Sequence, residues 1–160
     1  MALAKTDIKT AYPLPLYNYK VSILGDSNVN VIGFSEVSGL NVECQAVIYR
    51  HGLSFASGVN IISGIQQTIK LTLKKGLSKN GDFLQQWFTE SHTDPYSATA
   101  KRDVVIDLCD ETGFPVIRWK ALNALPTKID APNFTANSNE VAIASMELIA
   151  ADLKVDYKPS

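Results

Sequence analysis

The sequence predicts a mainly β fold, an antiparallel β-barrel or sandwich with one α-helix and a long protruding β-hairpin. Apolar and polar residues alternate with a period of two along most of the chain, which is typical of half-buried strands. Only residues 82–91 have helical spacing instead. With 160 residues, 46% of them hydrophobic, the chain can bury one core. We therefore expect an N-terminal arm at residues 1–13 and a single β domain at residues 14–160.

The strands are predicted from this alternation in chain order. The first is expected over Tyr17–Ile23, where tyrosine, valine and isoleucine alternate with polar residues. Two long amphipathic strands are expected at residues 42–49 and 65–75, joined by a mobile, glycine-bearing loop over His51–Gly64. The remaining strands are expected at Val104–Cys109, at Val116–Leu122 and at Val141–Ile149, the last with an extension through Val155.

One helix is predicted, over Asp82–Ser91. Its apolar side chains recur at positions i, i+1, i+4 and i+5, which places them on one face. We expect Phe83, Trp87 and Phe88 to pack this helix onto the barrel as part of the core.

Composition and motifs argue against several classes of function. The net charge of −1 provides no strong field for nucleic acid or anionic lipid, so no membrane binding by the chain itself is expected. No phosphate-binding loop, zinc-protease motif, paired-cysteine motif or nucleophile elbow occurs. His51 and His92 are isolated, and Cys44 and Cys109 are interpreted as small buried residues. We therefore expect no enzymatic activity, no cofactor and no metal.

The two long strands form a ribbon that needs a packing partner. A two-stranded ribbon is marginally stable alone, and its edges and apolar face invite pairing with another chain. Packing on the core of the same chain is the alternative, and the pattern alone leaves it open. The apolar side of this ribbon is the predicted subunit interface, formed by Val42, Cys44, Ala46, Ile48, Ile69, Leu71 and Leu73.

Four segments resemble the inner-tube (tail tube) proteins of contractile phage tails and of phage-tail-like contractile injection systems. Residues 34–40 are similar to the F-x-x-V-S-G-L segment of that family, and residues 73–76 to its strand-to-helix junction. Residues 119–127 resemble its W-x-x-x-N-A-x-P-T segment, and residues 138–152 its final strand, which begins S-N-E-V-A. The resemblance extends in order from Leu14 to Val155. The N-terminal arm and an insertion at Thr93–Arg102 depart from the family pattern.

The resemblance implies a subunit that assembles with itself into hexameric rings, stacked head to tail as a hollow tube. It also implies a surrounding sheath, baseplate and terminator or cap proteins as partners, with possible protein cargo in the lumen. On this interpretation the polar side of the ribbon faces the lumen. The predicted lumen-facing residues are Asn41, Glu43, Gln45, Thr68, Lys70 and Thr72.

The leading functional hypothesis is thus a structural tube protein, driven through a target envelope when the sheath contracts. The alternatives are the tail tube of a contractile phage, which conducts DNA, and a monomeric ligand-binding barrel. The N-terminal segment has no apolar core of signal-peptide length. We therefore expect a chain made and assembled in the bacterial cytoplasm, as part of a released particle or a virion.

Overall fold

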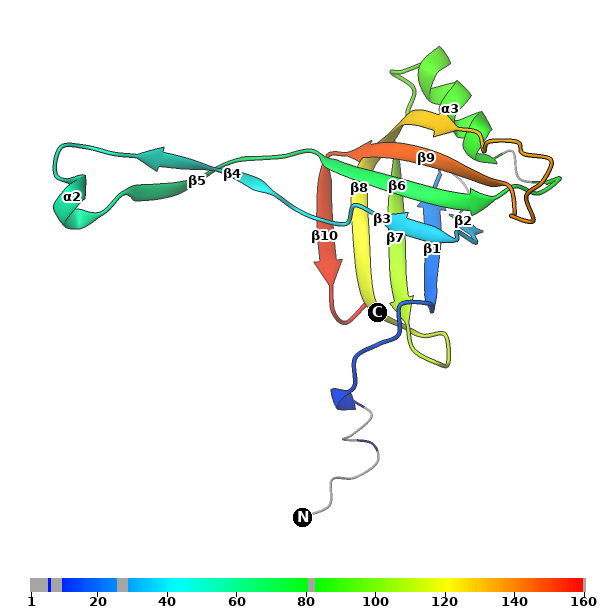
Figure 1. Cartoon of the computed structure of the whole chain (residues 1–160), viewed down its shortest axis with the longest axis horizontal. Helices are drawn as coiled ribbons and strands as arrows, with labels where there is room; N and C mark the ends of the chain where they lie inside the picture. Colours follow the sequence, from blue (N-terminus) through cyan, green and yellow to red (C-terminus); the bar gives the residue numbers. More distant parts are fainter. Residues whose placement is uncertain (1–5, 7–9, 26–28, 81–82, 160) are drawn as a thin grey trace.

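The computed structural model describes residues 6, 10–25, 29–80 and 83–159, and its strands form a barrel-like body with a projecting hairpin (Figure 1). The elements are β1 (Tyr19–Leu24), β2 (Val29–Ile32), β3 (Glu36–Ser38), β4 (Cys44–Tyr49), α2 (Ser54–Ser57), β5 (Asn60–Gln66), β6 (Ile69–Gly76), α3 (Phe83–Thr93), β7 (Arg102–Cys109), β8 (Pro115–Asp130), β9 (Ile143–Ala150) and β10 (Asp152–Asp156). All described strand pairs are antiparallel. The predicted fold class is confirmed.

The long strand β8 belongs to two sheets. Its first half pairs with β7 and β10, and its second half pairs with β9. We call β2, β1, β7, the first half of β8 and β10 the first sheet, and the second half of β8, β9, β6 and β3 the second sheet. The two sheets are joined where β8 bends at Asn123, whose φ of 53° lies in the left-handed region that asparagine tolerates better than most residues.

Apolar side chains from both sheets fill the space between them. Val21 and Ile23 of the first sheet are fully buried, as are Leu71 and Leu148 of the second. Successive strand residues point to opposite faces, so the alternating pattern places one face of each strand in this core. The described residues between the sheets therefore form a packed core.

The helix α3 covers one end of the body, and Trp87 anchors it. The start predicted at Asp82 lies outside the described residues. Trp87 is fully buried, and its Nε1–H donates a hydrogen bond to the carbonyl oxygen of Ala100 at 3.0 Å. Phe83 and Phe88 are half-buried and pack against the same core. The aromatic stripe on the helix thus faces the barrel.

Arg102 holds the helix to the start of β7. Its guanidinium carbon lies 5.4 Å from the ring centroid of Phe83 and 5.5 Å from that of Trp87. The same side chain forms an ion pair with Glu90 at 2.9 Å and donates to the carbonyl oxygen of Thr99 at 3.0 Å. Cation–π and charged contacts therefore order the last part of the segment that departs from the family pattern.

The hairpin consists of β4, the short helix α2 and β5, and it projects from the body (Figure 1). The predicted pairing of residues 42–49 with residues 65–75 is wrong, because β4 pairs with β5 while β6 pairs with β3 and β9. Residues 51–64, expected to be a loop, contain α2 and most of β5. The prediction failed because Ile61 and Ile62 are adjacent apolar residues, so this strand shows no alternation.

Two further expectations concern the chain ends and membranes. The arm predicted at residues 1–13 lies mostly outside the described residues, so its boundary stays a prediction. Within the described residues, no helix combines the length and the apolar character needed to cross a membrane.

Candidate functional site: the hairpin and the polar sheet face

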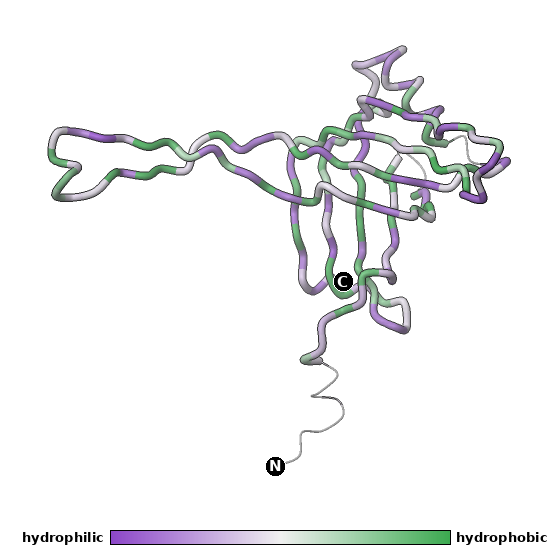
Figure 2. Tube along the Cα trace, in the orientation of Figure 1, coloured by the Kyte–Doolittle hydropathy of each residue, from purple (hydrophilic) through white to green (hydrophobic). Residues whose placement is uncertain are grey.

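The hairpin exposes every residue of β4 and all of β5 except the half-buried Gly64. Figure 2 shows hydrophobic stretches on both of its arms. Its tip carries Phe55, which is 88% exposed, and Leu53. Exposed apolar side chains on a projecting element are typical of a surface that contacts another molecule.

The predicted interface residues separate into two groups. Val42, Cys44, Ala46 and Ile48 are exposed, on the hairpin or at its base, and their role in subunit contacts stays a prediction. The expectation that Cys44 is buried is wrong in the single chain, whereas Cys109 is buried, which raises the pKa of its thiol.

Ile69, Leu71 and Leu73 do not belong to the hairpin. They lie on β6, are at most 1% exposed and pack in the chain's own core. Their assignment to a subunit interface is wrong, because the core of the same subunit already covers them. The alternation along β6 correctly predicted an apolar and a polar face but did not identify what covers the apolar one.

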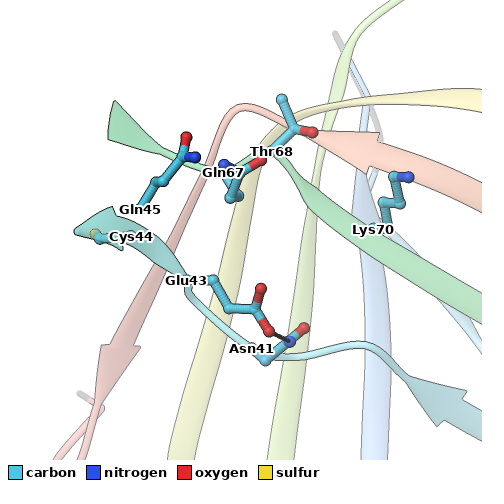
Figure 3. Close-up of a pocket in the computed structure, with 7 residues that line it drawn as sticks. All are labelled: Asn41, Glu43, Cys44, Gln45, Gln67, Thr68 and Lys70. Carbon is cyan, nitrogen blue, oxygen red and sulfur yellow. Dashed lines mark hydrogen bonds between the residues drawn. The ribbon is translucent and has the colours of Figure 1, made fainter. Parts of the chain in front are cut away.

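A polar groove of about 490 Å³ lies at the base of the hairpin (Figure 3). Five of the six predicted lumen-facing residues line it, namely Asn41, Glu43, Gln45, Thr68 and Lys70, together with Cys44 and Gln67. The Asn41 side chain donates to Glu43 Oε1 at 3.4 Å, and the N–H of Gln67 donates to the Glu43 carbonyl at 2.7 Å. The sixth residue, Thr72, lies further along β6 and is half-buried. That all six face a lumen stays a prediction.

The groove continues onto the polar face of the second sheet, the face opposite the core. Its charges are mixed, because Lys74 pairs with Glu36 at 2.9 Å and Lys128 with Asp130 at 2.8 Å. The hydrogen bond to Asp130 and the nearby charges of Asp130 and Glu147 raise the pKa of Lys128. This face therefore carries balanced positive and negative charges.

The outward face of the first sheet carries a row of alternating charges. Cross-strand pairing places Lys20 opposite Asp107, Asp107 opposite Arg118 and Arg118 opposite Asp156. Arg118 binds Asp107 through two contacts, at 2.6 and 3.1 Å. These contacts raise the pKa of Arg118. The row is an ordered set of cross-strand charge pairs, in which Asp107 itself is buried beneath Arg118.

Each of the two histidines contacts a residue close to it in the chain. His51 Nδ1 accepts a hydrogen bond from the N–H of Leu53 at the hairpin tip. The ring of His92 stacks on Phe88 with centroids 4.3 Å apart at the end of α3. Within the described part of the chain, no cluster of three or more His, Cys, Asp or Glu side chains could hold a metal ion.

Two glycines matter to the site for reasons that alternation could not reveal. Gly39 has a φ of 89°, and a side chain there would overlap the carbonyl oxygen of Lys70. A side chain at Gly64 would likewise overlap the carbonyl oxygen of Gln45 on the opposite hairpin strand. Gly39 lies in the F-x-x-V-S-G-L segment, so the family motif marked its position in the sequence. None of the four quoted segments contains Gly64.

These features define a class of protein. The described core is packed, and a projecting hairpin carries exposed apolar side chains that no other described part of the chain covers. This is the architecture of a structural subunit that is completed by a larger assembly.

Comparing the chain with models of known protein families indicates which kind of assembly this is. Residues 15–154 match the model of the family described as T4-like virus tail tube protein gp19. The chain therefore belongs to this tail tube family, which confirms the resemblance of the four segments. No curated protein sequence matches the chain.

Solved structures agree with this assignment. The chain is similar to one in the PVC sheath–tube complex of an extracellular contractile injection system in the extended state, with 28% identity and a TM-score of 0.83 over 98% of this chain and 99% of that chain. It is also similar to a chain in the tube-terminating cap of the anti-feeding prophage, with 29% identity and a TM-score of 0.78 over 91% and 92%. A crystal structure of an Hcp protein, 12% identical with a TM-score of 0.51, covering 87% of this chain and 98% of that chain, shares the fold. The protein is thus a tail tube protein of the kind found in contractile injection systems and phage tails.

Proposed function

We propose that the chain assembles into hexameric rings that stack head to tail as the inner tube of a contractile injection system. The observation that carries the proposal is the hairpin, whose exposed apolar residues are not covered by any other described residue of the chain. Family membership supports a tube, and the 28% identity over nearly the whole length of both chains supports an injection system.

In this tube the polar face of the second sheet lines the channel. That face joins the groove containing Thr68 and Lys70, and its opposite side is the packed core. Because the core side is already filled, the polar side is free to face water or cargo. The balanced pairs Lys74–Glu36 and Lys128–Asp130 give a wall without a strong net charge.

The outward face of the first sheet then faces the sheath. The charged row on this face exposes Lys20 and Asp156 at its two ends, and these charges can form and release contacts with a sliding partner. The proposed partners are a sheath, a baseplate and a terminator or cap protein. The similar chains from a sheath–tube complex and a tube-terminating cap support this set.

The proposed activity is mechanical. The tube is pushed through a target envelope when the sheath contracts, and it can house protein cargo. It is assembled in the bacterial cytoplasm and acts as part of a released particle.

The tail tube of a contractile phage is a second candidate function. The family model, described by a T4-like virus tail tube protein, favours it. In that case the channel conducts DNA. The mixed charges of the polar sheet face favour protein cargo, because a channel for DNA gains from a wall that repels phosphate.

Negative-stain microscopy of the purified chain tests the proposal. We expect rings or tubes with a central hole. A chain that remains monomeric by sedimentation at high concentration would contradict the proposed assembly.

A further inference from the structure

The strand β8 bends where its ladder with β7 is irregular. Between the paired positions on either side, Asp103 of β7 faces two residues of β8, Leu122 and Asn123. Two residues opposite one form a β-bulge, which bends the strand and leaves a backbone group without its ladder partner. Asn123 also has the left-handed φ of 53°, so the direction of the chain changes here. The bulge is thus the place where β8 passes from the first sheet to the second.

A second part of the chain crosses between the sheets beside this bend. The strand β9 of the second sheet ends at Ala150 and β10 of the first sheet begins at Asp152, so only Ala151 separates them. In Figure 1 β10 turns sharply away from β9. The N–H of Ala151 donates to the carbonyl oxygen of Leu122 at 2.9 Å. The two crossings therefore lie side by side and form one joint between the sheets.

The carboxylate of Asp103 holds β8 at two points of this joint. Its Oδ1 accepts the backbone N–H of Asn123 at 3.0 Å, and its Oδ2 lies 3.6 Å from Nζ of Lys120. Lys120 belongs to the first half of β8, before the bend. A hydrogen bond to a charged acceptor is stronger than one to a neutral acceptor. One side chain of β7 thus supplies the partner that the bulge takes from the Asn123 backbone.

Asp152, the carboxylate at the other crossing, has a different arrangement. Its Oδ1 accepts the N–H of the next residue, Leu153, at 2.8 Å and the side-chain amide of Gln66 at 3.2 Å. Of the hydrogen bonds described for these two aspartates, only that of Asp103 reaches the residue that bends β8. Control of the bend is therefore assigned to Asp103.

We propose that Asp103 is a positioning residue that sets the angle between the two sheets of the subunit. Without its carboxylate, the N–H of Asn123 bonds to water and the bend can take several geometries. This clamp is a property of the single chain. Its consequence for assembly rests on the proposed tube function, in which the second sheet faces the channel and the first faces the sheath. Rings of uniform diameter then need the same sheet angle in every copy.

Three substitutions separate the hydrogen-bond acceptor from the charge. Asp103→Asn removes the charge but keeps an oxygen that can accept the N–H of Asn123. Asp103→Leu has a similar size and removes both. Lys120→Met removes the ion pair alone and is the matched control. We expect only the leucine variant to widen the range of sheet angles.

Pulsed electron paramagnetic resonance measures the sheet angle through the distance between two spin labels. The labels are attached at Lys70→Cys on the second sheet and Asp156→Cys on the first, both at exposed positions. Cys44→Ser removes the exposed native thiol, and Cys109 is buried. Dilution with unlabelled chain restricts the signal to distances within one subunit. We expect the distance distribution of Asp103→Leu to be about twice as wide as that of the wild type and the other two variants, because its bulge lacks the side-chain acceptor.

Two results would overturn the proposed clamp. One is a distance distribution of wild-type width in Asp103→Leu, and the other is equal widening in Asp103→Asn, which keeps an acceptor. Hydrogen exchange at the wild-type Asn123 amide adds a test that does not require any variant to fold. Rapid exchange there would show that this N–H is not held by Asp103, and slow exchange supports the clamp.

Electron microscopy of the assembled chains tests the consequence for the tube. We expect tubes of variable diameter from Asp103→Leu and uniform tubes from Lys120→Met. Uniform tubes from a leucine variant with a widened distance distribution would overturn the link between the joint and the tube. A wild-type chain that stays monomeric would contradict the tube function but not the clamp.

Discussion

Gly39 shows how a single residue positions the polar sheet face. Its backbone, with a φ of 89°, passes so close to β6 that a side chain would overlap the carbonyl oxygen of Lys70. This approach brings the strand leading to the hairpin alongside β6. The glycine of the family segment therefore has a physical reason in this chain.

We predict that Gly39→Ala destabilises the fold. The left-handed backbone alone costs an alanine about 1–2 kcal/mol, and the overlap with Lys70 adds to this cost. Urea unfolding of the variant measures the change. Gly33→Ala is the matched control, because a side chain at Gly33 meets open space and its φ is not positive. Equal effects of the two substitutions would contradict the argument.

Trp87 is the residue that anchors helix α3 to the body. We predict that Trp87→Ala lowers the free energy of unfolding by about 3–5 kcal/mol, the range for deleting a large buried aromatic side chain. The loss includes the hydrogen bond to Ala100 and the stacking with Arg102. Phe114→Ala, at a 72% exposed position, should change stability little. Thermal unfolding compares them, and a wild-type midpoint for Trp87→Ala would show that this packing is unimportant.

The elements differ in how well the sequence predicted them. The alternation over Val104–Cys109 and the helical stripe ending at Ser91 predicted β7 and α3 to within two residues at each described end. The strand predicted over Val116–Leu122 continues to Asp130, because Asn123 lets the chain bend without leaving the sheet. Such a bend depends on two sheets meeting in three dimensions, which a linear pattern does not contain.

The hairpin was predicted as a feature but with the wrong second strand. A strand with both faces apolar has no period of two, so Asn60–Gln66 gave no strand signal, while β6 gave a strong one. The exposed interface candidates on β4 were therefore grouped with residues of the core. What separates the two sets is burial, and burial depends on the packed structure.

A pair of matched substitutions distinguishes hairpin from core. We predict that Ile48→Asp leaves the subunit folded but blocks assembly, because it places a charge on a face that another chain must cover. Leu71→Asp should instead prevent folding, because Leu71 is fully buried. Circular dichroism and sedimentation on the same samples measure both properties. Loss of folding in Ile48→Asp would show that the hairpin belongs to the subunit core.

Gly64 tests the internal geometry of the hairpin. We predict that Gly64→Ala disturbs the pairing of β4 with β5 and weakens assembly, because the added carbon would overlap the Gln45 carbonyl. Gly52→Ala is the control in the same hairpin, since a side chain there meets nothing within 4 Å. Hydrogen exchange of the hairpin amides measures the pairing. Unchanged protection in Gly64→Ala would mean that the strands adjust at no cost.

At the scale of the whole molecule, each surface of the body has a distinct character. The second sheet presents balanced charges around the groove at Lys70, and the first sheet presents the charged row centred on Arg118 and Asp107. The hairpin presents apolar surface on both faces. A subunit in a hollow, sheathed tube needs these three surfaces, one toward the channel, one toward the sheath and one toward its own copies.

Cryo-electron microscopy of the assembled wild-type chain tests this account most directly. The account predicts stacked rings around an open channel, with Lys70 and Thr68 on the channel wall, Arg118 on the outer surface and Ile48 buried against another copy. Tubes in which Arg118 lines the channel, or in which the hairpin remains surrounded by water, would contradict it.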